Sequence, residues 1–452
     1  MTRCLALLVA ITAFLVPVGI SSTAEAAPPD NFQPRPGVTF NNPVGDRGKR
    51  RQIYNKIMRS IESSPGGSTI KFYTWNFLTS EGTNALLRAQ RRGVTVRVLM
   101  DAANNRDEIG NPPFRKLRAG LHKGNKERPK RPKSWAKTCQ NSCRGTGGAA
   151  HAKFFMFSQV GKVPRVVFQG SANFTLASTN NQWNDVVAHT RSKPVWQFYD
   201  RVFREGSKDK KAKPPFAAGH FGDFNLFMYP LQGAKVDPAY RLLNKVKCRG
   251  ATNTASGRTI LRLAPDVIRN ARGMKFARKI RGLWEAGCDV RIGYTVLGID
   301  IGRYLRGREG RGPVPMRHLV QDFDGDGQFD NYFHLKAMAI IGNVAGKRAN
   351  KVVLNGSANL SGLGAVSDEN LGIYWRGPLT ERYRQHIDYW YENFPADRSL
   401  NEVPNTATSP AARRAAAEGQ LVFGSGANAV YEDGTPYSTT GIDPYAKLAS
   451  LD

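Results

Sequence analysis

Two short motifs occur twice in this sequence, in the same order each time. The copies are His151-Ala-Lys153 with Gly170-Ser171-Ala172-Asn173, and His334-Leu-Lys336 with Gly356-Ser357-Ala358-Asn359. A neutral imidazole acts as a nucleophile or as an acid and base, and a lysine two positions further along a strand points to the same face. The Gly-Ser-x-Asn segment adds a tight turn, a hydroxyl and an amide. Together these groups suit a phosphate, with one histidine to attack it and one to protonate the leaving group.

The elements around the motifs also repeat. In the first half the pattern predicts a strand at 69–75, a helix at 83–92 and a buried strand at 94–99. In the second half it predicts helices at 240–247 and 277–286 and strands at 259–263 and 290–292. Apolar strands follow each lysine and precede each Gly-Ser pair. This alternation predicts βαβ units with a largely parallel sheet, and the paired motifs predict a two-lobed catalytic site.

With these motifs the sequence resembles the phospholipase D superfamily, whose members carry two H-x-K-x4-D motifs, each followed by G-S-x-N. The resemblance covers residues 40–395. It implies an α/β fold of two pseudo-symmetric βαβ-type lobes with mixed, mainly parallel sheets and one active site at the lobe interface. It also implies phosphodiester cleavage through a covalent phosphohistidine, with no metal or other cofactor required.

The resemblance further implies a role for each motif residue. His151 would be the nucleophile and His334 the general acid, although the residues alone fit either order. The groups expected to hold the phosphate oxygens are Lys153, Asn173, Lys336 and Asn359, helped by Ser171 and Ser357.

The sequence departs from the family pattern at the aspartate of the motif. Ser158 occupies this position in the first copy and Ile341 in the second. The tyrosyl-DNA phosphodiesterases also lack the aspartate, which indicates that the reaction type survives its loss. In the family an acidic residue after G-S-x-N often orients a catalytic histidine. Asp185 and Glu369, 12 and 10 residues after their asparagines, are expected to do this; solvated loop acids are the alternative.

The chain is strongly basic. Its 452 residues carry 66 Lys and Arg against 36 Asp and Glu, a formal net charge of +30, which favours nucleic acid, an anionic membrane or a phosphorylated substrate as partner. A hydrophobic fraction of 40% excludes a wholly disordered chain. Basic clusters lie at 106–144, 208–213, 269–281 and 303–317.

The basic insertion 106–144 comes directly before His151. It is either a lid over the site or a solvated insertion without a functional role. Phe114 and Trp135 lie within it, and we consider them for stacking on bases or insertion at a lipid interface.

Residues 1–27 are typical of a secretory signal peptide, with Arg3 before an apolar stretch and small residues near Ala26. Because the apolar core is shorter than the roughly 20 residues of a spanning helix, we expect cleavage and no transmembrane segment afterwards. The predicted mature protein is a secreted monomer. We expect a first lobe at 28–213, a second lobe at 214–400 and a flexible tail at 401–452.

Four cysteines remain after signal removal. In an exported chain they favour two disulfides over a zinc site, and three pairings are possible. We predict Cys139–Cys143 and Cys248–Cys288, because each pair lies within one structural unit.

An acidic segment precedes His334. Asp322, Asp324, Asp326 and Asp330 begin like a calcium loop, but Phe333 stands where an EF-hand needs its last glutamate. A structural Ca²⁺ and a plain Asp/Gly turn both remain open, and neither has a catalytic role.

These observations lead to three functional hypotheses. The first is a secreted phospholipase D-type phosphodiesterase that hydrolyses or transfers the head group of phospholipids at an anionic membrane surface. The alternative is a secreted, metal-independent endonuclease or other nucleic-acid phosphodiesterase, which the net charge of +30 fits through counterion release. The third, a catalytically weak anion-binding family member, is disfavoured by the intact histidines, lysines and asparagines.

Overall fold

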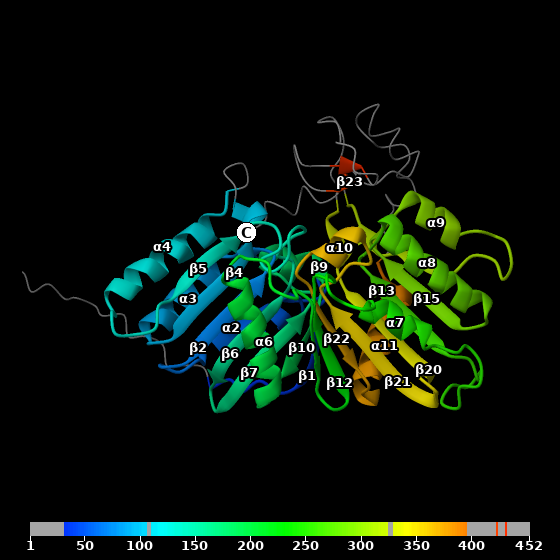
Figure 1. Cartoon of the computed structure of the whole chain (residues 1–452), viewed down its shortest axis with the longest axis horizontal. Helices are drawn as coiled ribbons and strands as arrows, with labels where there is room; N and C mark the ends of the chain where they lie inside the picture. Colours follow the sequence, from blue (N-terminus) through cyan, green and yellow to red (C-terminus); the bar gives the residue numbers. More distant parts are fainter. Residues whose placement is uncertain (1–30, 106–109, 324–328, 396–421, 424–429, 432–452) are drawn as a thin grey trace, which may run out of the picture.

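The computed structural model describes residues 31–105, 110–323 and 329–395, together with two short strands near the C-terminus. These strands, β23 (Val422–Phe423) and β24 (Val430–Tyr431), pair antiparallel. The predicted signal peptide and the rest of the predicted tail lie outside the described residues. Two α/β lobes lie side by side, each built around one large sheet (Figure 1).

The first lobe contains a seven-stranded sheet. In spatial order its strands are β1 (Gly37–Phe40), β10 (Asp185–His189), β7 (Val163–Gly170), β6 (Phe154–Val160), β2 (Thr69–Thr74), β4 (Thr95–Asp101) and β5 (Trp135–Cys139). Its helices are α1 (Arg47–Arg50), α2 (Gln52–Glu62), α3 (Ser80–Arg91), α4 (Pro112–Lys126), α5 (Leu176–Asn180) and α6 (Lys193–Gly206), with a 3-10 turn at Ala102–Asn105. Helix α3 begins at a cap, because the Thr79 side chain accepts a hydrogen bond from the Gly82 N–H.

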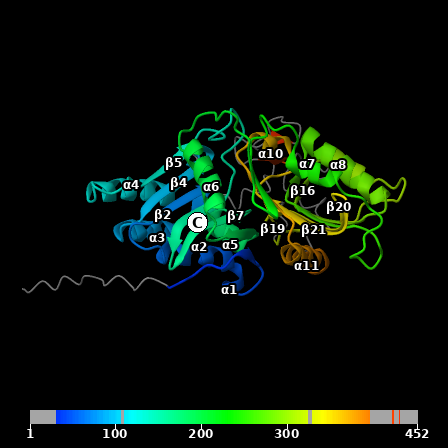
Figure 2. The same cartoon turned by 60° about the horizontal axis from the view of Figure 1, so that its bottom comes forward.

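The second lobe contains an eight-stranded sheet. In spatial order its strands are β11 (Ala217–His220), β12 (Phe224–Met228), β22 (Asn370–Tyr374), β21 (Lys347–Gly356), β20 (Lys336–Val344), β13 (Ile260–Pro265), β15 (Asp289–Tyr294) and β17 (Met316–His318). Its helices are α7 (Pro238–Asn244), α8 (Asn270–Glu285), α9 (Ile299–Leu305), α10 (Gly362–Val366) and α11 (Gly377–Asn393). Figure 2 shows α8 and α11 on opposite sides of this sheet.

Most strands of each sheet run in one direction, as predicted for a mixed α/β fold. Among the described strands of the two large sheets, however, parallel neighbours occur only within β2–β4–β5 and within β13–β15–β17. Helices provide the crossovers there. The other neighbours are antiparallel, and among them short hairpins connect β6 to β7 and β20 to β21. The predicted βαβ units therefore form three neighbouring strands of each large sheet.

A continuous apolar core joins the two lobes. One cluster of buried side chains takes members from both sheets, among them Phe154 and Trp183 of the first lobe and Tyr374 and Trp390 of the second. Within this seam Gln169 and Asn355, which hold equivalent positions before the two Gly-Ser pairs, are hydrogen-bonded at 2.8 Å. Equivalent residues meet at a two-fold axis, so this bond marks the pseudo-symmetry between the lobes.

Three small sheets complete the fold. They are β3 (Phe77–Leu78) with β8 (Phe174–Thr175), β14 (Val267–Ile268) with β16 (Val296–Leu297), and β18 (Val320–Gln321) with β19 (Asn331–Phe333) and β9 (Gln182–Trp183). The last of these crosses between the lobes, because β9 belongs to the first lobe and β19 to the second.

The basic segment before His151 is not a lid in the part that the structure describes. Helix α4 and strand β5 extend the first sheet as a further parallel crossover. Phe114 is fully buried against Phe77, with ring centroids 6.2 Å apart, and Trp135 stacks on Phe203 at 5.7 Å. Phe114 therefore packs the interior and is not offered to a base or a lipid, whereas Trp135 is half-buried against the core.

Both predicted disulfides are confirmed. Cys139 is bonded to Cys143 and Cys248 to Cys288. The first closes the turn after β5, and the second ties the segment after α7 to the start of β15.

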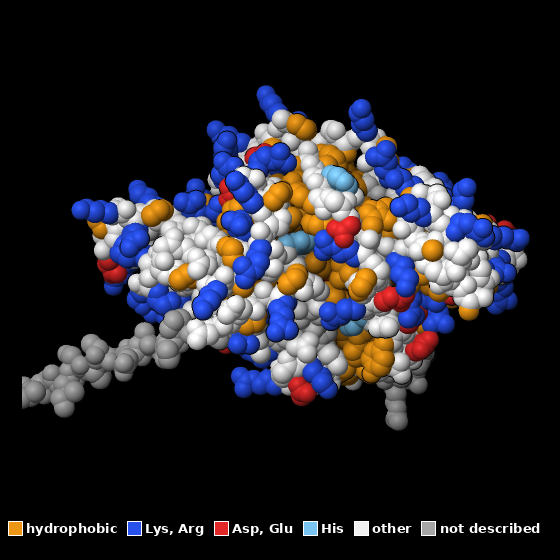
Figure 3. Space-filling model, turned by 90° about the horizontal axis from the view of Figure 1, so that it is seen from below, with side chains coloured by type: hydrophobic (Ala, Val, Ile, Leu, Met, Phe, Trp, Pro, Cys, Tyr) orange, Lys and Arg blue, Asp and Glu red, His pale blue; other side chains and the backbone are white. Residues whose placement is uncertain are grey.

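Part of the positive charge has a structural role. Arg281 and Arg317 donate hydrogen bonds to main-chain carbonyls of neighbouring segments, and the guanidinium of Arg311 lies 3.4 Å from the ring centroid of Trp284. On the lower face of the molecule, Lys and Arg side chains are spread over both lobes while apolar side chains gather along the middle (Figure 3). Within the three long described stretches, no helix has the length and apolarity to cross a bilayer.

Candidate active site

His151 lies in the short segment before β6, where it is held by the second lobe. Ala150 forms a parallel bridge with Asp368, so the residues that follow each of them are brought face to face. Nδ1 of His151 lies 2.9 Å from both carboxylate oxygens of Glu369. The Asp101 carboxylate accepts the Ala150 N–H at 2.7 Å and fixes the main chain before the histidine. The His151 side chain remains 17% exposed, so its Nε2 edge is open to a ligand.

His334 is held in the corresponding way by the first lobe. It directly follows β19, which pairs with β9, and its N–H donates to the Trp183 carbonyl at 3.0 Å. Nδ1 of His334 lies 2.8 Å from Oδ1 of Asn184, the residue after β9. Because the Asn184 amide nitrogen donates elsewhere, to the Ser178 carbonyl, its oxygen faces the imidazole and receives the Nδ1 proton. Each histidine is thus oriented by the opposite lobe.

Asp185 does not orient a histidine, contrary to the sequence prediction. Its carboxylate is buried and accepts hydrogen bonds from the Asn355 amide, at 2.6 Å, and from the Tyr383 hydroxyl. The position equivalent to Glu369 is Asn184, one residue earlier. The prediction failed because only acidic residues were considered, whereas an amide oxygen also fixes an imidazole tautomer.

Ser171 and Ser357 are also placed differently from the prediction. Both are fully buried, and their hydroxyls donate to the groups that orient the histidines: Ser171 to Asn184 Oδ1 at 2.9 Å, and Ser357 to the Glu369 carboxylate. Each hydroxyl also accepts a main-chain N–H, from Asp185 or Asn370. The serines therefore position the orienting side chains and are not available to a phosphate.

The two lysines lie beside their histidines as the spacing predicted. Lys153 Nζ donates to the main-chain carbonyl of His151, and Lys336 Nζ donates to that of His334 at 2.8 Å. Both ammonium groups are buried, and Lys336 also forms an ion pair with Asp266 at 2.9 Å.

Asn173 and Asn359 keep their side chains free for a ligand. In the part of the chain that the structure describes, neither side chain forms a hydrogen bond, and both amide oxygens are buried without a partner. An unpaired buried amide costs free energy, so its retention in both half-sites fits a role in binding.

Asp266 is a site residue that the sequence analysis missed. It follows β13 and is buried, with Oδ2 at 3.9 Å from Nε2 of His334 and Oδ1 without a partner among the described residues. The first lobe has Trp75 in the comparable place after β2, with its ring 5.7 Å from that of His151. No spacing rule links Asp266 to His334, which lies 68 residues later; only the alignment of the two halves could have indicated it.

The electrostatics of the site connect both half-sites. Burial lowers the pKa of His151, and the Glu369 carboxylate partly opposes this. Burial also lowers the pKa of His334 well below its usual value, helped by the charges of Lys336 and Lys153. The pKa values of both lysines are lowered by burial. Both imidazoles are therefore neutral near pH 7 in the free protein, which leaves one ready to attack.

The replaced motif aspartates lie away from these groups. Ser158 accepts the Thr69 N–H at 2.8 Å at the far end of β6, and Ile341 is buried in β20 between β13 and β21. Seven residues of extended chain separate each from its histidine, roughly 20 Å. The replacement of the two motif aspartates by Ser158 and Ile341 therefore changes β6 and β20 at positions away from the histidines.

The possible calcium loop is only partly described. Asp324 and Asp326 lie outside the described residues, whereas the Asp330 carboxylate accepts the Phe323 N–H at 2.6 Å. Elsewhere in the described ranges, no three His, Cys, Asp or Glu side chains are grouped as a metal site.

Comparison with known proteins agrees with this geometry. Residues 57–206 match the family model described as "Cardiolipin synthase, PLD-like domain". The phosphatidylserine synthase of Haemophilus influenzae Rd KW20 shares the fold, with a TM-score of 0.53, 12% identity, and coverage of 81% of this chain and 90% of that one. The polyphosphate kinase of Porphyromonas gingivalis gives a TM-score of 0.52 at 12% identity over 82% of this chain.

The chain spans about half of that kinase, 54% of its length. The search of curated proteins found no match. The family match over residues 57–206 shows a PLD-like domain in the first lobe, and the fold shared across both lobes extends the structural likeness to the second.

Proposed function

We propose that the protein is a phosphodiesterase that hydrolyses or transfers the head group of phospholipids through a phosphohistidine. His151 Nε2 attacks phosphorus, the bond from phosphorus to the leaving oxygen breaks, and that oxygen takes a proton from Nε2 of His334. Water or an acceptor alcohol then attacks phosphorus, gives its proton back to His334 and releases His151. The match of residues 57–206 to a PLD-like domain supports phosphoryl-transfer chemistry in general; the reaction and substrate are our proposal.

The crossed pair of histidine contacts carries this proposal. Glu369 of the second lobe holds Nδ1 of His151, and Asn184 of the first lobe holds Nδ1 of His334. Both contacts leave the Nε2 atoms as the reactive positions. Two reactive imidazoles supported by two lysines match the needs of a displacement at phosphorus that uses one nucleophile and one acid.

A bound phosphate accounts for the protonated general acid that the reaction needs and that the free site lacks. Because burial and two ammonium groups disfavour protonated His334, an incoming anionic phosphodiester raises its pKa by adding opposite charge. The general acid is then protonated when substrate is present. Lys153, Lys336 and the two free asparagine side chains hold the phosphate oxygens in this scheme.

Apolar side chains near the site favour a lipid. Helix α10 begins three residues after Asn359, and on it Leu363 is 50% exposed and Val366 38% exposed. Exposed aliphatic side chains gain free energy by entering hydrocarbon, and they add nothing to a nucleic-acid backbone contact. The expected export of the protein would bring it to extracellular lipid surfaces.

The test is an assay of the purified protein with EDTA on phosphatidylcholine vesicles and, separately, on plasmid DNA. We expect choline release without DNA cleavage, and loss of the release in His151→Asn. The matched control is His122→Asn, which changes an exposed histidine on α4 and should leave turnover unchanged. DNA cleavage without choline release would replace the lipid proposal by the nuclease, and loss of activity with EDTA would refute a metal-independent reaction.

A further inference from the structure

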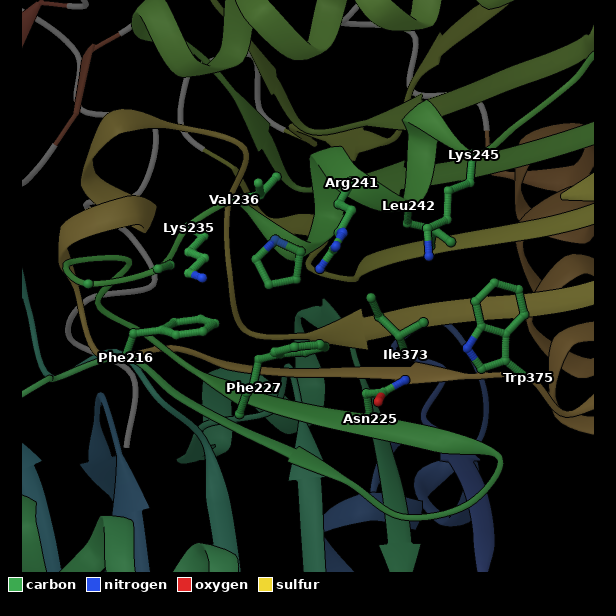
Figure 4. A pocket seen from close by; sticks show the side chains of 14 residues that line it. Phe216, Asn225, Phe227, Lys235, Val236, Arg241, Leu242, Lys245, Ile373 and Trp375 are labelled. Atoms are coloured by element: carbon green, nitrogen blue, oxygen red, sulfur yellow. The ribbon is translucent and has the colours of Figure 1, made fainter. Parts of the chain in front are cut away.

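A pocket of about 460 Å³ lies in the second lobe outside the catalytic constellation. One wall is the outer part of the sheet, where Phe227 lies on β12 and Ile373 on β22. The opposite wall is α7 with the segment at 231–236 that leads into it. Figure 4 shows Lys235, Arg241 and Lys245 extending from this second wall toward the aromatic and aliphatic side chains of the first. The volume is in the range of small-molecule sites.

The polar groups of the pocket are all donors. No carboxylate is among its lining residues. The Asn225 side-chain oxygen is engaged by Nδ1 of His220 at 2.8 Å, which leaves the amide nitrogen for a ligand. Lys235, Arg241 and Lys245 form no ion pair and no side-chain hydrogen bond with any residue that the structure describes.

This contrasts with arginines close by that are paired. Arg272 forms an ion pair with Asp237 at 2.9 Å, and Arg376 binds Asp223 through two nitrogens. The pocket thus gathers three unpaired cations over one apolar floor, beside arginines that are paired. Arg241 lies on α7 and Lys245 is the C-cap of this helix, four positions later, so the two share one face. Charge complementarity requires an anionic ligand, and the apolar floor requires a ligand with an apolar part.

The rim of the pocket supports a lipid as this ligand. Val236, next to Lys235, is 46% exposed. The segment at 231–236 lies against α10, because the Leu231 N–H donates to the Ala365 carbonyl at 2.8 Å. Helix α10, which carries the exposed Leu363 and Val366 and begins three residues after Asn359, is therefore a neighbour of this segment. A nucleotide would use the cations but not these exposed aliphatic side chains.

We propose that this pocket is a second binding site for an anionic phospholipid, separate from the catalytic site. The lipid phosphate binds Lys235, Arg241 and Lys245, the adjoining apolar part packs on Phe216, Phe227 and Trp375, and Val236 with α10 enters the membrane surface. The bound lipid holds the protein on anionic membranes with the reaction site at the lipid. This binding does not require turnover, so it stands independently of the proposed reaction.

The experiment measures vesicle binding by the full chain carrying His151→Asn, which prevents turnover. Binding to vesicles of phosphatidylglycerol with phosphatidylcholine is compared with binding to phosphatidylcholine alone. Replacing Lys235, Arg241 and Lys245 together by Gln should weaken binding to the anionic vesicles roughly 100-fold, since each cation at an anionic surface contributes several-fold. The matched control replaces Lys116, Lys123 and Lys126 of α4, three exposed lysines in the other lobe, by Gln and should change the affinity by much less.

Two further measurements distinguish the occupant. Val236→Ser with Leu363→Ser should weaken vesicle binding while leaving the thermal midpoint unchanged, because both side chains are exposed. Equal losses in the pocket variant and the α4 control would overturn the proposal in favour of general charge attraction. A pocket variant that loses affinity for a single-stranded DNA oligonucleotide but not for vesicles would assign the pocket to nucleic acid, and competition by millimolar inorganic phosphate alone would reduce it to a phosphate site.

Discussion

The two half-sites share one construction around each histidine and differ in the side chain that orients it. In both, a buried serine holds a side chain that crosses the lobe interface to Nδ1 of a histidine. Behind His151 that side chain is the carboxylate of Glu369, and behind His334 it is the amide of Asn184. The duplication thus preserved the geometry of orientation while the charge behind the two imidazoles became different.

This difference supports a distinct role for each histidine. A phosphohistidine that keeps its Nδ1 proton is cationic on the ring, and a carboxylate at Nδ1 stabilises that charge. An amide oxygen fixes the tautomer without holding the ring in its cationic form, which suits a group that must release a proton. We therefore propose from Glu369 that His151 is the nucleophile and from Asn184 that His334 is the acid, which is the order that the family resemblance implies.

Removing the histidines one at a time tests this assignment with the largest effect. We expect His151→Asn to lower turnover at least 10⁴-fold on every substrate, because no phosphoenzyme forms. His334→Asn should lower turnover of an alkyl phosphodiester roughly 10²- to 10⁴-fold. On a p-nitrophenyl phosphodiester, whose leaving group needs no proton, His334→Asn should still release one burst of p-nitrophenol per protein molecule. A burst in His151→Asn and none in His334→Asn would reverse the roles.

Removing the charge of Glu369, which contacts the proposed nucleophile, is the next test. Glu369→Gln keeps the hydrogen bond and removes the carboxylate, so we expect kcat to fall about 10- to 100-fold. Glu369 raises the pKa of His151 against the effect of burial, so the substitution lowers that pKa further. The acid limb of the kcat/KM profile should therefore move to lower pH. An unchanged limb with the same loss of kcat would mean that Glu369 acts only in packing.

The sequence predicted most of this fold and one of the two side chains that orient the histidines. The duplicated His-x-Lys and Gly-Ser-x-Asn motifs indicated two lobes, because their spacing and flanking strands repeat. Glu369 was found because it is acidic and stands at a suitable distance from its asparagine. Asn184 was missed for the same reason: with Asp185 next to it, a rule that seeks carboxylates chooses the wrong neighbour, and only the pairing of β9 with β19 shows which one faces His334.

The remaining errors have a common physical cause. Ser171 and Ser357 were expected to help hold the phosphate, and Phe114 was considered for stacking, because their side chains are capable of such contacts. Burial decided otherwise, since a hydroxyl or ring inside the protein is taken by its neighbours before any ligand arrives. Asp266 escaped because it is brought to His334 by the sheet, through the antiparallel pairing of β13 with β20, and not by proximity in the chain.

Asp266 offers a smaller test of the difference between the two half-sites, because the first lobe has Trp75 in the same place. Its carboxylate forms an ion pair with Lys336 at 2.9 Å and so competes with an incoming phosphate for this lysine. Asp266→Asn should therefore lower KM a few-fold, and lower kcat less than tenfold through loss of charge near His334. Asp223→Asn, an exposed partner of Arg376, is the control and should change neither. A rise in KM would show that Asp266 serves to hold Lys336 for the substrate.

A third histidine in the seam between the lobes gives the smallest effect and separates stability from catalysis. His386 stacks on Phe40 at 3.8 Å, and its Nε2 is buried with no hydrogen-bond partner among the described residues. Burial lowers its pKa to about 3, whereas the unfolded chain titrates near 6.5.

Below pH 6.5 His386 is therefore protonated in the unfolded state but stays neutral in the folded state. As a result the free energy of unfolding decreases as the pH is lowered. At pH 5 this costs about 2 kcal/mol relative to pH 8. His386→Phe keeps the stacked ring and removes the titration, so we expect the thermal midpoint to rise by roughly 2 °C more at pH 5 than at pH 8. Calorimetry at both pH values measures this, with turnover at pH 7 unchanged. An equal shift at both pH values would mean that packing alone is altered, and a loss of turnover would mean that the orientation of His151 and His334 depends on this part of the seam.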